Sequence, residues 1–393
     1  MTPRPPESGL NGTAVDASTP PLTVRLHRVR LDGARHGDGA TLRSAREVIV
    51  DREVIIVEVV DADGHIGWGE CSALPTPGYT PEYLGGCWSL LRDILVPEVV
   101  ADPIEALAYL TAFPGHPMAR SALIGALIDL DLRAGGRSLA TALADGGAPA
   151  PQVRSTAVVG MHDDPADLEA AVERALAAGH QSVKLKIDPL HDVVAVQTVR
   201  RQWPDLPLAV DANASYGDAD EAVAALARIE AVAGSLAYVE QPLAADDLVG
   251  ATVVARRTST PVALDESVTS LGEAVTAISL GAVGILNCKP ARVGGPLAAI
   301  AIARVMVEEG VGVFCGGMVE SGIGRAAALA FAAQDVCTLP TDLGPSERYH
   351  REDLTRPFVL SEGAIAVPTG PGIGVAPDAD VLAAHTIARW QFR

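Results

Sequence analysis

Charged side chains end several short apolar runs in the second half of the chain, and their types suit acid–base and metal chemistry. The runs SVKLKID, LPLAVDA, LAYVEQP, PVALDES and VGILNCK carry Lys184 and Lys186, Asp211, Glu240, Asp265 and Lys289. From Lys186 onward, successive members of this set are 24 to 29 residues apart. One strand and one helix account for that spacing, so we expect all of them at one edge of a parallel barrel.

Three of these residues, Asp211, Glu240 and Asp265, are carboxylates on neighbouring predicted strands. They would repel one another strongly unless a cation held them. Carboxylate oxygens suit Mg²⁺, with Mn²⁺ as the alternative. Lys186 and Lys289 flank the three from opposite sides of the predicted mouth, which makes them candidates for an acid–base pair.

Lys184 and Lys186 are two positions apart, so both side chains should face the barrel interior. Two ammonium groups beside a metal predict a lowered pKa for at least one of them, which would make a usable base. Lys184 alone also fits an interior counter-charge. We expect Glu266 to point to the other face and to be structural, although parity alone does not decide whether Asp265 or Glu266 binds a metal.

The elements that must position these residues follow from a repeat of about 25 residues between 156 and 317, in which short apolar runs alternate with helical segments. Asp164 and Asp218 start two of the helices, and Gly179 and Gly234 end them. Seven or eight such units predict a (β/α) barrel. A doubly wound parallel sheet is the alternative, but no GxGxxG motif follows the first strand and no P-loop is present.

The first 150 residues have a different pattern, typical of an α+β domain. Alternating segments at 22–30, 46–60 and 65–71 predict an antiparallel meander, and residues 81–147 predict helices. We therefore divide the chain into a disordered leader 1–21, a capping domain 22–150, a barrel 151–355 and a C-terminal segment 356–393 that returns to the capping domain.

Composition excludes several classes of protein. The chain has 393 residues, of which 48% are hydrophobic and 20% charged, so it is not a disordered protein. Its net charge of −19 disfavours nucleic acid and anionic membranes as partners. Five cysteines without a CxxC motif, no secretory signal and no long apolar stretch predict a reduced, cytoplasmic protein.

The motifs KLK, VDAN, VEQPL, LDES, NCKPARVGG and CGGMVESGIGR resemble those of the enolase superfamily, over residues 22 to 385. Lys-x-Lys on the second strand and a lone Lys on the sixth resemble the muconate-lactonizing-enzyme subgroup. GWGEC followed by YTPEY, the GGMVESGIGR stretch and the tail PFVLSEGAIAVPTGPGIGVAP resemble the o-succinylbenzoate synthase and N-acylamino acid racemase family. This resemblance implies an α/β fold: a TIM-like, modified (β/α)7β barrel with an N-terminal α+β capping domain.

The resemblance also implies residue roles. Asp211, Glu240 and Asp265 would bind Mg²⁺, and Lys186 and Lys289 would be the catalytic acid–base pair. This agrees with the interpretation from their spacing.

In the family, two loops of the capping domain supply specificity, and they match residues 33–42 and the segment around Tyr79. Arg292 matches a family arginine near the second lysine. Ala291 departs from the more usual Gly, and the loop 33–42 lacks the expected Pro-Phe, so the substrate stays open. The substrate-binding candidates are Lys184, Asn213, Arg292, Gly317, Met318, Glu320 and Tyr79.

The implied reaction is removal of a proton alpha to a carboxylate, with Mg²⁺ stabilising the enediolate. Lys186 takes the proton. In a synthase, a beta hydroxyl then leaves with help from Lys186 and gives o-succinylbenzoate for menaquinone synthesis, while Lys289 stabilises charge. In a racemase, Lys289 returns a proton on the opposite face. We expect the synthase as the main activity, with N-succinylamino acid racemase close behind. The resemblance also implies a small carboxylate substrate and a homo-oligomer.

Two other functions stay open from the sequence. One is a dipeptide epimerase or a muconate-type cycloisomerase; an epimerase usually has an Asp-x-Asp motif after the seventh strand, where this chain has GGMVESG. The other is a non-catalytic barrel, which would need the loss of a ligand or a lysine, and none is lost.

Overall fold

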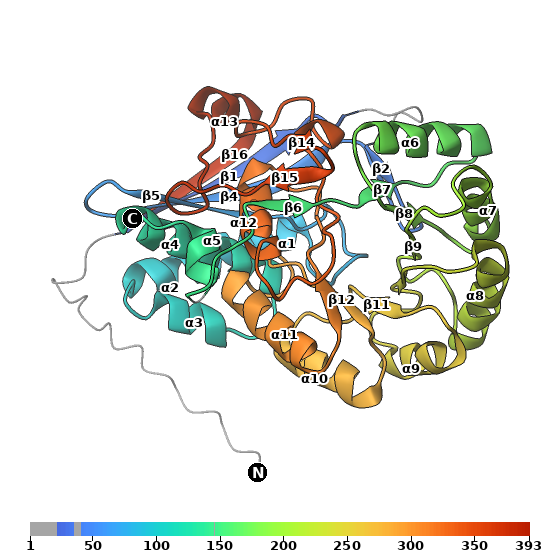
Figure 1. Cartoon of the computed structure of the whole chain (residues 1–393). Coiled ribbons are helices and arrows are strands. Elements are labelled where there is room, and N and C mark those ends of the chain that lie inside the picture. Colours follow the sequence, from blue (N-terminus) through green and yellow to red (C-terminus); the bar gives the residue numbers. More distant parts are fainter. Residues whose placement is uncertain (1–21, 35–40, 145) are drawn as a thin grey trace, which may run out of the picture.

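The computed structural model describes residues 22–34, 41–144 and 146–393. Figure 1 shows them as a ring of strands and helices beside a smaller layer that contains the N-terminal sheet. The predicted leader 1–21 lies outside the described residues, as does the central part of the predicted specificity loop 33–42.

Seven parallel strands form the barrel wall, and their order in the sheet is their order in the chain. Because this order never reverses, the predicted barrel is confirmed and the doubly wound alternative is wrong. The strands are β7(Ala157–Val159), β8(Val183–Lys186), β9(Leu208–Asp211), β10(Val239–Glu240), β11(Val262–Leu264), β12(Ile285–Asn287) and β13(Gly312–Phe314).

Residues 339–343 connect the two ends of this sheet, although they form no regular strand. On one side, the backbone N–H of Leu339 donates to the oxygen of Val313 over 3.1 Å. On the other side, the N–H of Thr156 donates to the oxygen of Thr341 over 2.7 Å. The segment therefore takes the place of an eighth strand between β13 and the start of β7.

Helices between the strands begin where the capping residues predict. The side chain of Asp164 accepts from the N–H of Ala166 over 2.8 Å, and that of Asp218 accepts from the N–H of Glu221 over 2.9 Å. The helices are α6(Pro165–Ala177), α7(Asp192–Gln202), α8(Ala219–Ala233), α9(Leu248–Arg257), α10(Leu271–Leu280), α11(Pro296–Glu308) and α12(Gly322–Ala332).

The N-terminal sheet is antiparallel, in the order β16-β1-β4-β5, so the predicted meander is present. Its strands are β1(Thr23–Leu31), β4(Arg52–Val60), β5(Ile66–Cys71) and β16(Thr386–Phe392). The helices beside it are α1(Leu84–Leu90), a π-helical turn η1(Leu91–Leu95), α2(Val96–Ala101), α3(Ala106–Ala112), α4(Pro117–Ala134) and α5(Leu139–Leu143).

The prediction of one strand over 46–60 is wrong in its first part. β3(Val48–Ile49) pairs with β2(Leu42–Arg43) in a separate hairpin. The reason is Thr41, whose N–H binds the oxygen of Ile49 over 2.8 Å and whose hydroxyl binds the oxygen of Val50 over 3.0 Å. These bonds direct the chain away from the sheet before β4 begins.

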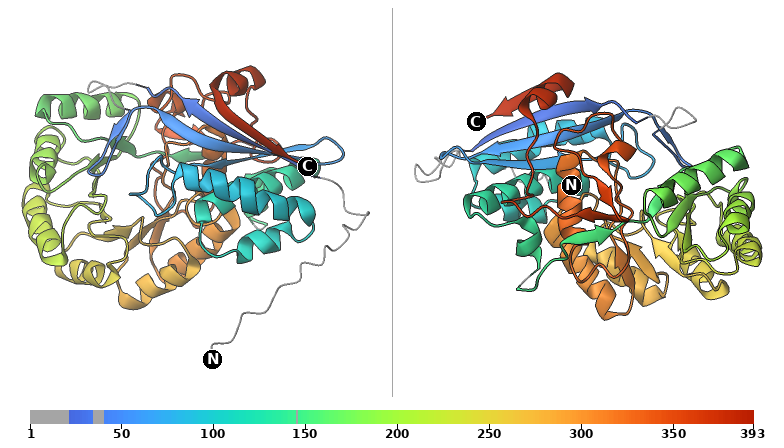
Figure 2. Two further views of the ribbon diagram at one scale, coloured as in Figure 1. Left: turned by 180° about the vertical axis from the view of Figure 1, so that it is seen from behind. Right: turned by 45° about the horizontal axis from the view of Figure 1, so that its top comes forward.

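The C-terminal residues lie beside the N-terminal ones. Figure 2 shows β16 along the edge of β1, and the two strands pair antiparallel. Before that, β14(Leu360–Ser361) and β15(Ala364–Ala366) form a small sheet with β6(Gln152–Arg154), at the start of the barrel, and α13(Ala379–His385) follows.

The GWG stretch of β5 lets α4 pack directly on the sheet. A Cβ at Gly69 would lie 2.0 Å from the backbone oxygen of Ala122, and one at Gly67 would lie 2.1 Å from that of Ala126. Any larger residue would push the helix away from the sheet.

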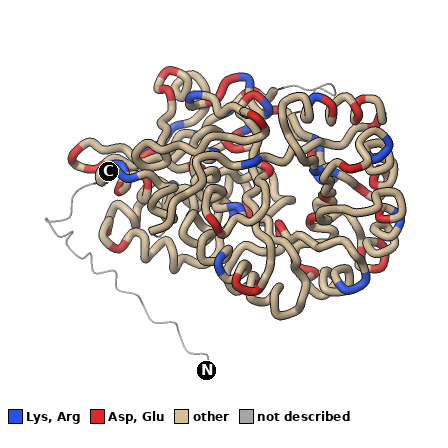
Figure 3. The backbone as a smooth tube through the Cα atoms, in the orientation of Figure 1, with Lys and Arg blue, Asp and Glu red and all other residues tan. Residues whose placement is uncertain are grey.

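Among the described residues, no helix is both long and apolar enough to cross a membrane. All five cysteines are unpaired. Acidic and basic positions are interspersed along the tube in Figure 3.

Candidate active site

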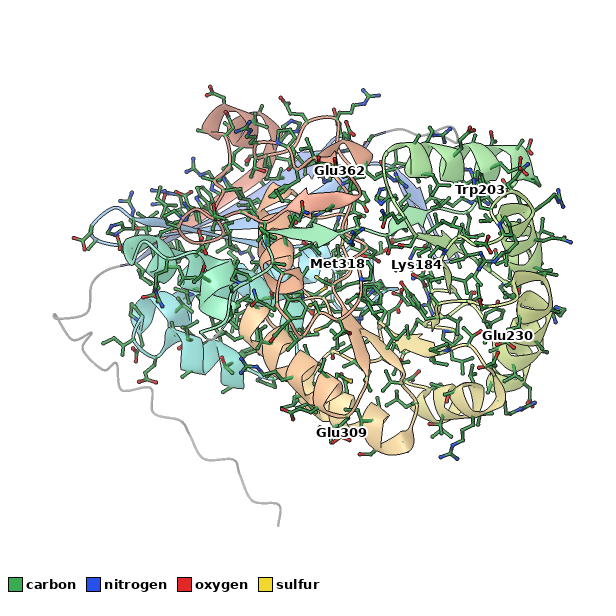
Figure 4. All side chains as sticks on the ribbon, viewed as in Figure 1. Lys184, Trp203, Glu230, Glu309, Met318 and Glu362 are labelled. Carbon is green, nitrogen blue, oxygen red and sulfur yellow. The ribbon has the colours of Figure 1, made fainter. Side chains whose placement is uncertain are left out.

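The carboxyl ends of β8 to β12 bring the predicted charged residues to one mouth. Lys186 is in register with Asp211 across β8 and β9, and Asp211 is in register with Glu240 across β9 and β10. Asp265 directly follows β11, and Lys289 follows β12. Figure 4 places Lys184 within the ring of barrel elements. These side chains therefore converge at one mouth, as their spacing in the sequence predicts.

Lys186 binds two groups on the neighbouring strand end. Its Nζ lies 2.5 Å from Oδ2 of Asp211 and 2.9 Å from Oδ1 of Asn213. Asn213 has a φ of 43°, a left-handed conformation that Asn tolerates better than most residues. Its own N–H donates to Oδ1 of Asp211 over 2.9 Å, which fixes the turn that places it beside the lysine.

Lys289 lies in a second cluster with Asp265, Tyr79 and Arg292. Its Nζ donates to Oδ2 of Asp265 and to the Tyr79 hydroxyl, both over 2.9 Å. Arg292 places Nη1 2.6 Å from Oδ1 of the same carboxylate. Burial alone would raise the pKa of Asp265, but Arg292 and Lys289 outweigh it and hold that pKa at about 2. Burial alone would lower the pKa of Lys289, and Asp265 instead raises it well above its usual range.

Lys184 is fully buried among carboxylates. Its Nζ lies 2.7 Å from Oε2 of Glu240, 2.5 Å from Oδ2 of Asp342 and 3.7 Å from Oδ2 of Asp211. Burial would lower the pKa of Lys184, but Asp342 and Glu240 raise it well above its usual range. The pKa of Lys184 is therefore raised, which matches the alternative of an interior counter-charge.

The carboxylates crowd one another even with these lysines present. Burial, followed by the charge of Asp211, raises the pKa of Glu240 to about 7. Burial, followed by Asp265 and Asp211, raises the pKa of Glu266 to about 8. Glu266 Oε1 lies 3.4 Å from Nδ2 of Asn213, and its Oε2 is buried with no hydrogen-bond partner among the residues that the structure describes. The expectation that Glu266 points away is wrong, because the chain turns after β11 and brings both neighbouring carboxyls to the mouth.

A cavity of about 70 Å³ lies between the barrel mouth and the N-terminal part of the chain. Figure 4 shows Met318 on the side of the ring that faces the N-terminal part. The cavity wall contains most of the predicted substrate and catalytic residues: Lys186, Lys289, Tyr79, Asn213, Gly317 and Met318.

The β2–β3 hairpin is bonded to the rim of this mouth. Arg46 donates from Nε to the oxygen of Asn213 over 2.5 Å and from Nη2 to the oxygen of Ala214 over 3.2 Å. Its Nη1 donates to the oxygen of Gly78 over 3.2 Å. One side chain thus joins the hairpin, the Tyr79 segment and the turn after β9.

Three predicted substrate-binding residues do not line the cavity. Lys184 lies beneath it against Glu240, and Arg292 is buried against Asp265. Glu320 forms an ion pair with Arg325 and accepts from the N–H of Met318, so it holds the loop after β13 instead of facing the cavity.

Sequence reasoning missed two buried partners of the site. Asp342 binds Lys184 and accepts from the N–H of Gly317 over 2.8 Å. Asn287 donates from Nδ2 to Oε1 of Glu240 over 2.7 Å. Asn287 lies in the run VGILNCK, two residues before Lys289, so strand parity could have pointed to it. Asp342 follows no apolar run and gave no such signal.

Comparison with known proteins agrees with this geometry. The family described as enolase C-terminal domain-like matches residues 167–381. The chain is 42% identical over 345 residues to an N-succinylamino acid racemase from Amycolatopsis sp, which covers 86% of this chain and 91% of the relative. It is 36% identical over 345 residues to an o-succinylbenzoate synthase from Bacillus subtilis, with the same shares of 86% and 91%.

A solved structure supports the same family assignment. The structure of an enolase-superfamily member from Listeria innocua superimposes with a TM-score of 0.86 at 29% identity, over 95% of this chain and 99% of that one. The chain is an enzyme of the enolase superfamily, in its muconate-lactonizing-enzyme subgroup, and belongs to the family of the o-succinylbenzoate synthases and N-succinylamino acid racemases.

Proposed function

We propose that this enzyme removes the proton alpha to a substrate carboxylate and directs the product of that step to dehydration, as an o-succinylbenzoate synthase, or to racemisation of an N-succinylamino acid. The observation that carries the proposal is that Lys186 and Lys289 line one cavity from β8 and β12, with three strands between them. Two bases on different sides of one substrate suit the removal and return of a proton. The two relatives support both fates.

The proposed cofactor is a divalent cation, Mg²⁺ or Mn²⁺, held by Asp211, Glu240 and Asp265. The charges at the mouth support it, because carboxylates outnumber cationic side chains. The carboxylates are Asp211, Glu240, Asp265, Glu266 and Asp342, and the cationic side chains are Lys184, Lys186, Lys289 and Arg292.

Oxygen donors of this kind suit hard divalent cations. Burial first, and then the charge of the neighbouring carboxylates, raise the pKa values of Glu240 and Glu266, and a bound cation would offset that repulsion. When bound, the cation offsets the negative charge that develops on the substrate carboxylate.

In this proposal Lys186 is the base that takes the alpha proton. A lysine can accept a proton only when it is uncharged, and Asp211 and Asn213 then orient its lone pair through the contacts that they make with Nζ. In the synthase reaction Lys186 gives the same proton to the leaving hydroxyl.

Lys289 acts from the other side. Asp265 keeps Lys289 protonated, and Tyr79 helps to fix the direction of its Nζ. A protonated lysine can return a proton to the second face in racemisation, and in dehydration its charge stabilises the developing negative charge. The cytoplasmic location and the homo-oligomer stay predictions.

The test follows the alpha proton. The enzyme with Mg²⁺ is mixed in D₂O with N-succinylamino acids, and loss of the alpha-proton signal is measured by NMR together with optical rotation. Dehydration of the o-succinylbenzoate precursor is measured separately by absorbance. We expect at least one of the two activities, its loss on exhaustive chelation and its loss in Lys186→Ala. Full activity without metal by elemental analysis, or neither activity with metal, contradicts the proposal.

A further inference from the structure

Glu47, on the hairpin that is bonded to the barrel rim, lies where two spaces meet. It lines the inner cavity that Lys186 and Lys289 also line. It also lines a second space of about 520 Å³, here called the outer groove, whose other walls include residues of β4 and residues 74–76. Ile49 and Leu74 line both spaces too. The inner cavity of about 70 Å³ is small for a complete substrate, so part of a longer substrate must extend beyond it, and the groove adjoins it at Glu47.

The carboxylate of Glu47 has no hydrogen-bond or salt-bridge partner among the residues that the structure describes. It is partly buried, and burial raises its pKa in spite of the charges of Arg52 and Lys186. Both of these cations are bound elsewhere. Arg52 donates to backbone oxygens, including those of Ala73 and Met318, and Lys186 binds Asp211.

The position of Glu47 is fixed by its neighbour. Arg46 bonds the hairpin to the oxygens of Asn213 and Ala214 on the barrel and to Gly78. On the other strand of the hairpin, the oxygen of Arg43 accepts from the N–H of Met161 over 3.0 Å. The unpaired carboxylate is therefore held at the junction of the two spaces.

The other carboxylates of the outer groove differ from Glu47 because each has a cationic partner. Glu53 forms an ion pair with Arg28 over 2.7 Å, and Asp51 forms one with Arg30 over 3.1 Å. Neither of them lines the inner cavity. A partly buried carboxylate without a partner costs free energy in the empty enzyme, and a cationic group of the substrate would relieve that cost.

We propose that Glu47 is a specificity-determining residue that selects substrates with a cationic side chain, namely N-acyl derivatives of lysine or arginine. The alpha carbon lies between Lys186 and Lys289, and the side chain extends past Glu47 toward the outer groove, where its ammonium or guanidinium group meets the carboxylate. This inference rests on the racemase activity proposed above and names its substrate class.

The experiment compares two substrates of similar length, N-succinyl-L-lysine and N-succinyl-L-norleucine, by NMR of alpha-proton exchange in D₂O with Mg²⁺. We expect wild-type kcat/KM to favour the lysine derivative by about tenfold or more, as a charge pair in a partly desolvated site should produce. Glu47→Gln keeps the size of the side chain and should reduce this preference to about twofold, chiefly through KM. Glu53→Gln, which removes a carboxylate already paired with Arg28, is the matched control and should leave the preference unchanged.

Wild-type enzyme provides a second measurement that needs no variant. Its preference for the lysine derivative should fall as the salt concentration rises, whereas exchange of the norleucine derivative should change little. Equal exchange of the two substrates by wild type, or an unchanged preference in Glu47→Gln, overturns the role of Glu47 and leaves the racemase proposal intact. Absence of exchange with every N-succinylamino acid overturns both.

Discussion

The hydroxyl of Tyr79 accepts a hydrogen bond from Nζ of Lys289 over 2.9 Å, and the same hydroxyl lies 3.1 and 3.0 Å from the two oxygens of Asp265. Tyr79 comes from the N-terminal part of the chain, whereas Lys289 and Asp265 come from the barrel. The groups that surround Lys289, the second proposed base, therefore come from both parts of the chain.

Tyr79→Phe should weaken the steps that depend on Lys289. Without the hydroxyl the ammonium keeps Asp265 but loses the contact that fixes its direction, so we expect racemisation to slow by about tenfold. Exchange on the face of Lys186 should stay within about twofold of wild type. Exchange of each enantiomer by NMR measures both faces. Tyr83→Phe, at an exposed position, is the control, and equal losses on both faces would contradict the role assigned to Tyr79.

Arg46→Met should loosen the hairpin over the site. The variant loses three hydrogen bonds, to Asn213, Ala214 and Gly78, while it keeps a side chain of similar length. We expect KM to rise by about tenfold and kcat to change less, because the hairpin contributes to binding more than to proton transfer. Mg²⁺ affinity, measured by calorimetry, should be unchanged. Arg92→Met, which removes an exposed arginine paired with Asp93, is the control, and an Arg46→Met enzyme with wild-type KM would show that the hairpin is only a connection.

Glu70 should make stability depend on pH. This buried residue of β5 accepts from the N–H groups of Ser321 and Gly324, over 3.1 and 3.0 Å, at the start of α12. Burial raises the pKa of Glu70 from 4.5 to about 7 in spite of these bonds. Between these two values the folded chain holds a proton that the unfolded chain has released. The contribution of Glu70 to stability is therefore complete below about pH 4.5 and is lost as the pH rises through about 7.

Glu70→Gln tests this dependence, because glutamine does not ionise. We expect the unfolding free energy of wild type, measured by urea denaturation, to fall relative to that of the variant between pH 5 and pH 8. The fall should amount to up to about 3 kcal/mol. Parallel pH profiles for the two proteins would show that Glu70 is ionised in the folded enzyme throughout this range.

The sequence predicts the barrel and its mouth well because the repeat of strand and helix determines both. Strand ends must meet at one edge, so Lys186, Asp211, Glu240, Asp265 and Lys289 could be placed together from their spacing alone. The helix starts at Asp164 and Asp218 depend on local capping chemistry, so the sequence predicts them equally well.

Other features depend on contacts that no local pattern encodes. Asp342 reaches Lys184 because an irregular segment closes the barrel, and Glu266 reaches the mouth because the chain turns after β11. The hairpin of β2 and β3 leaves the N-terminal sheet through the hydroxyl of Thr41, which a pattern of alternating residues does not show. The pKa of Lys184 depends on the number of carboxylates around it, and this number is known only from the fold.

The central claim is that Lys186 and Lys289 serve opposite faces of one substrate, and exchange of each enantiomer of an N-succinylamino acid in D₂O tests it most directly. Lys186→Ala should abolish both racemisation and dehydration. Lys289→Ala should abolish racemisation, with a rate loss of about 10²–10⁴ for a positioned acid or base, but should still exchange the one enantiomer whose alpha proton faces Lys186. Exchange of both enantiomers at wild-type rates in Lys289→Ala would contradict the account, because Lys289 would then not be the second base.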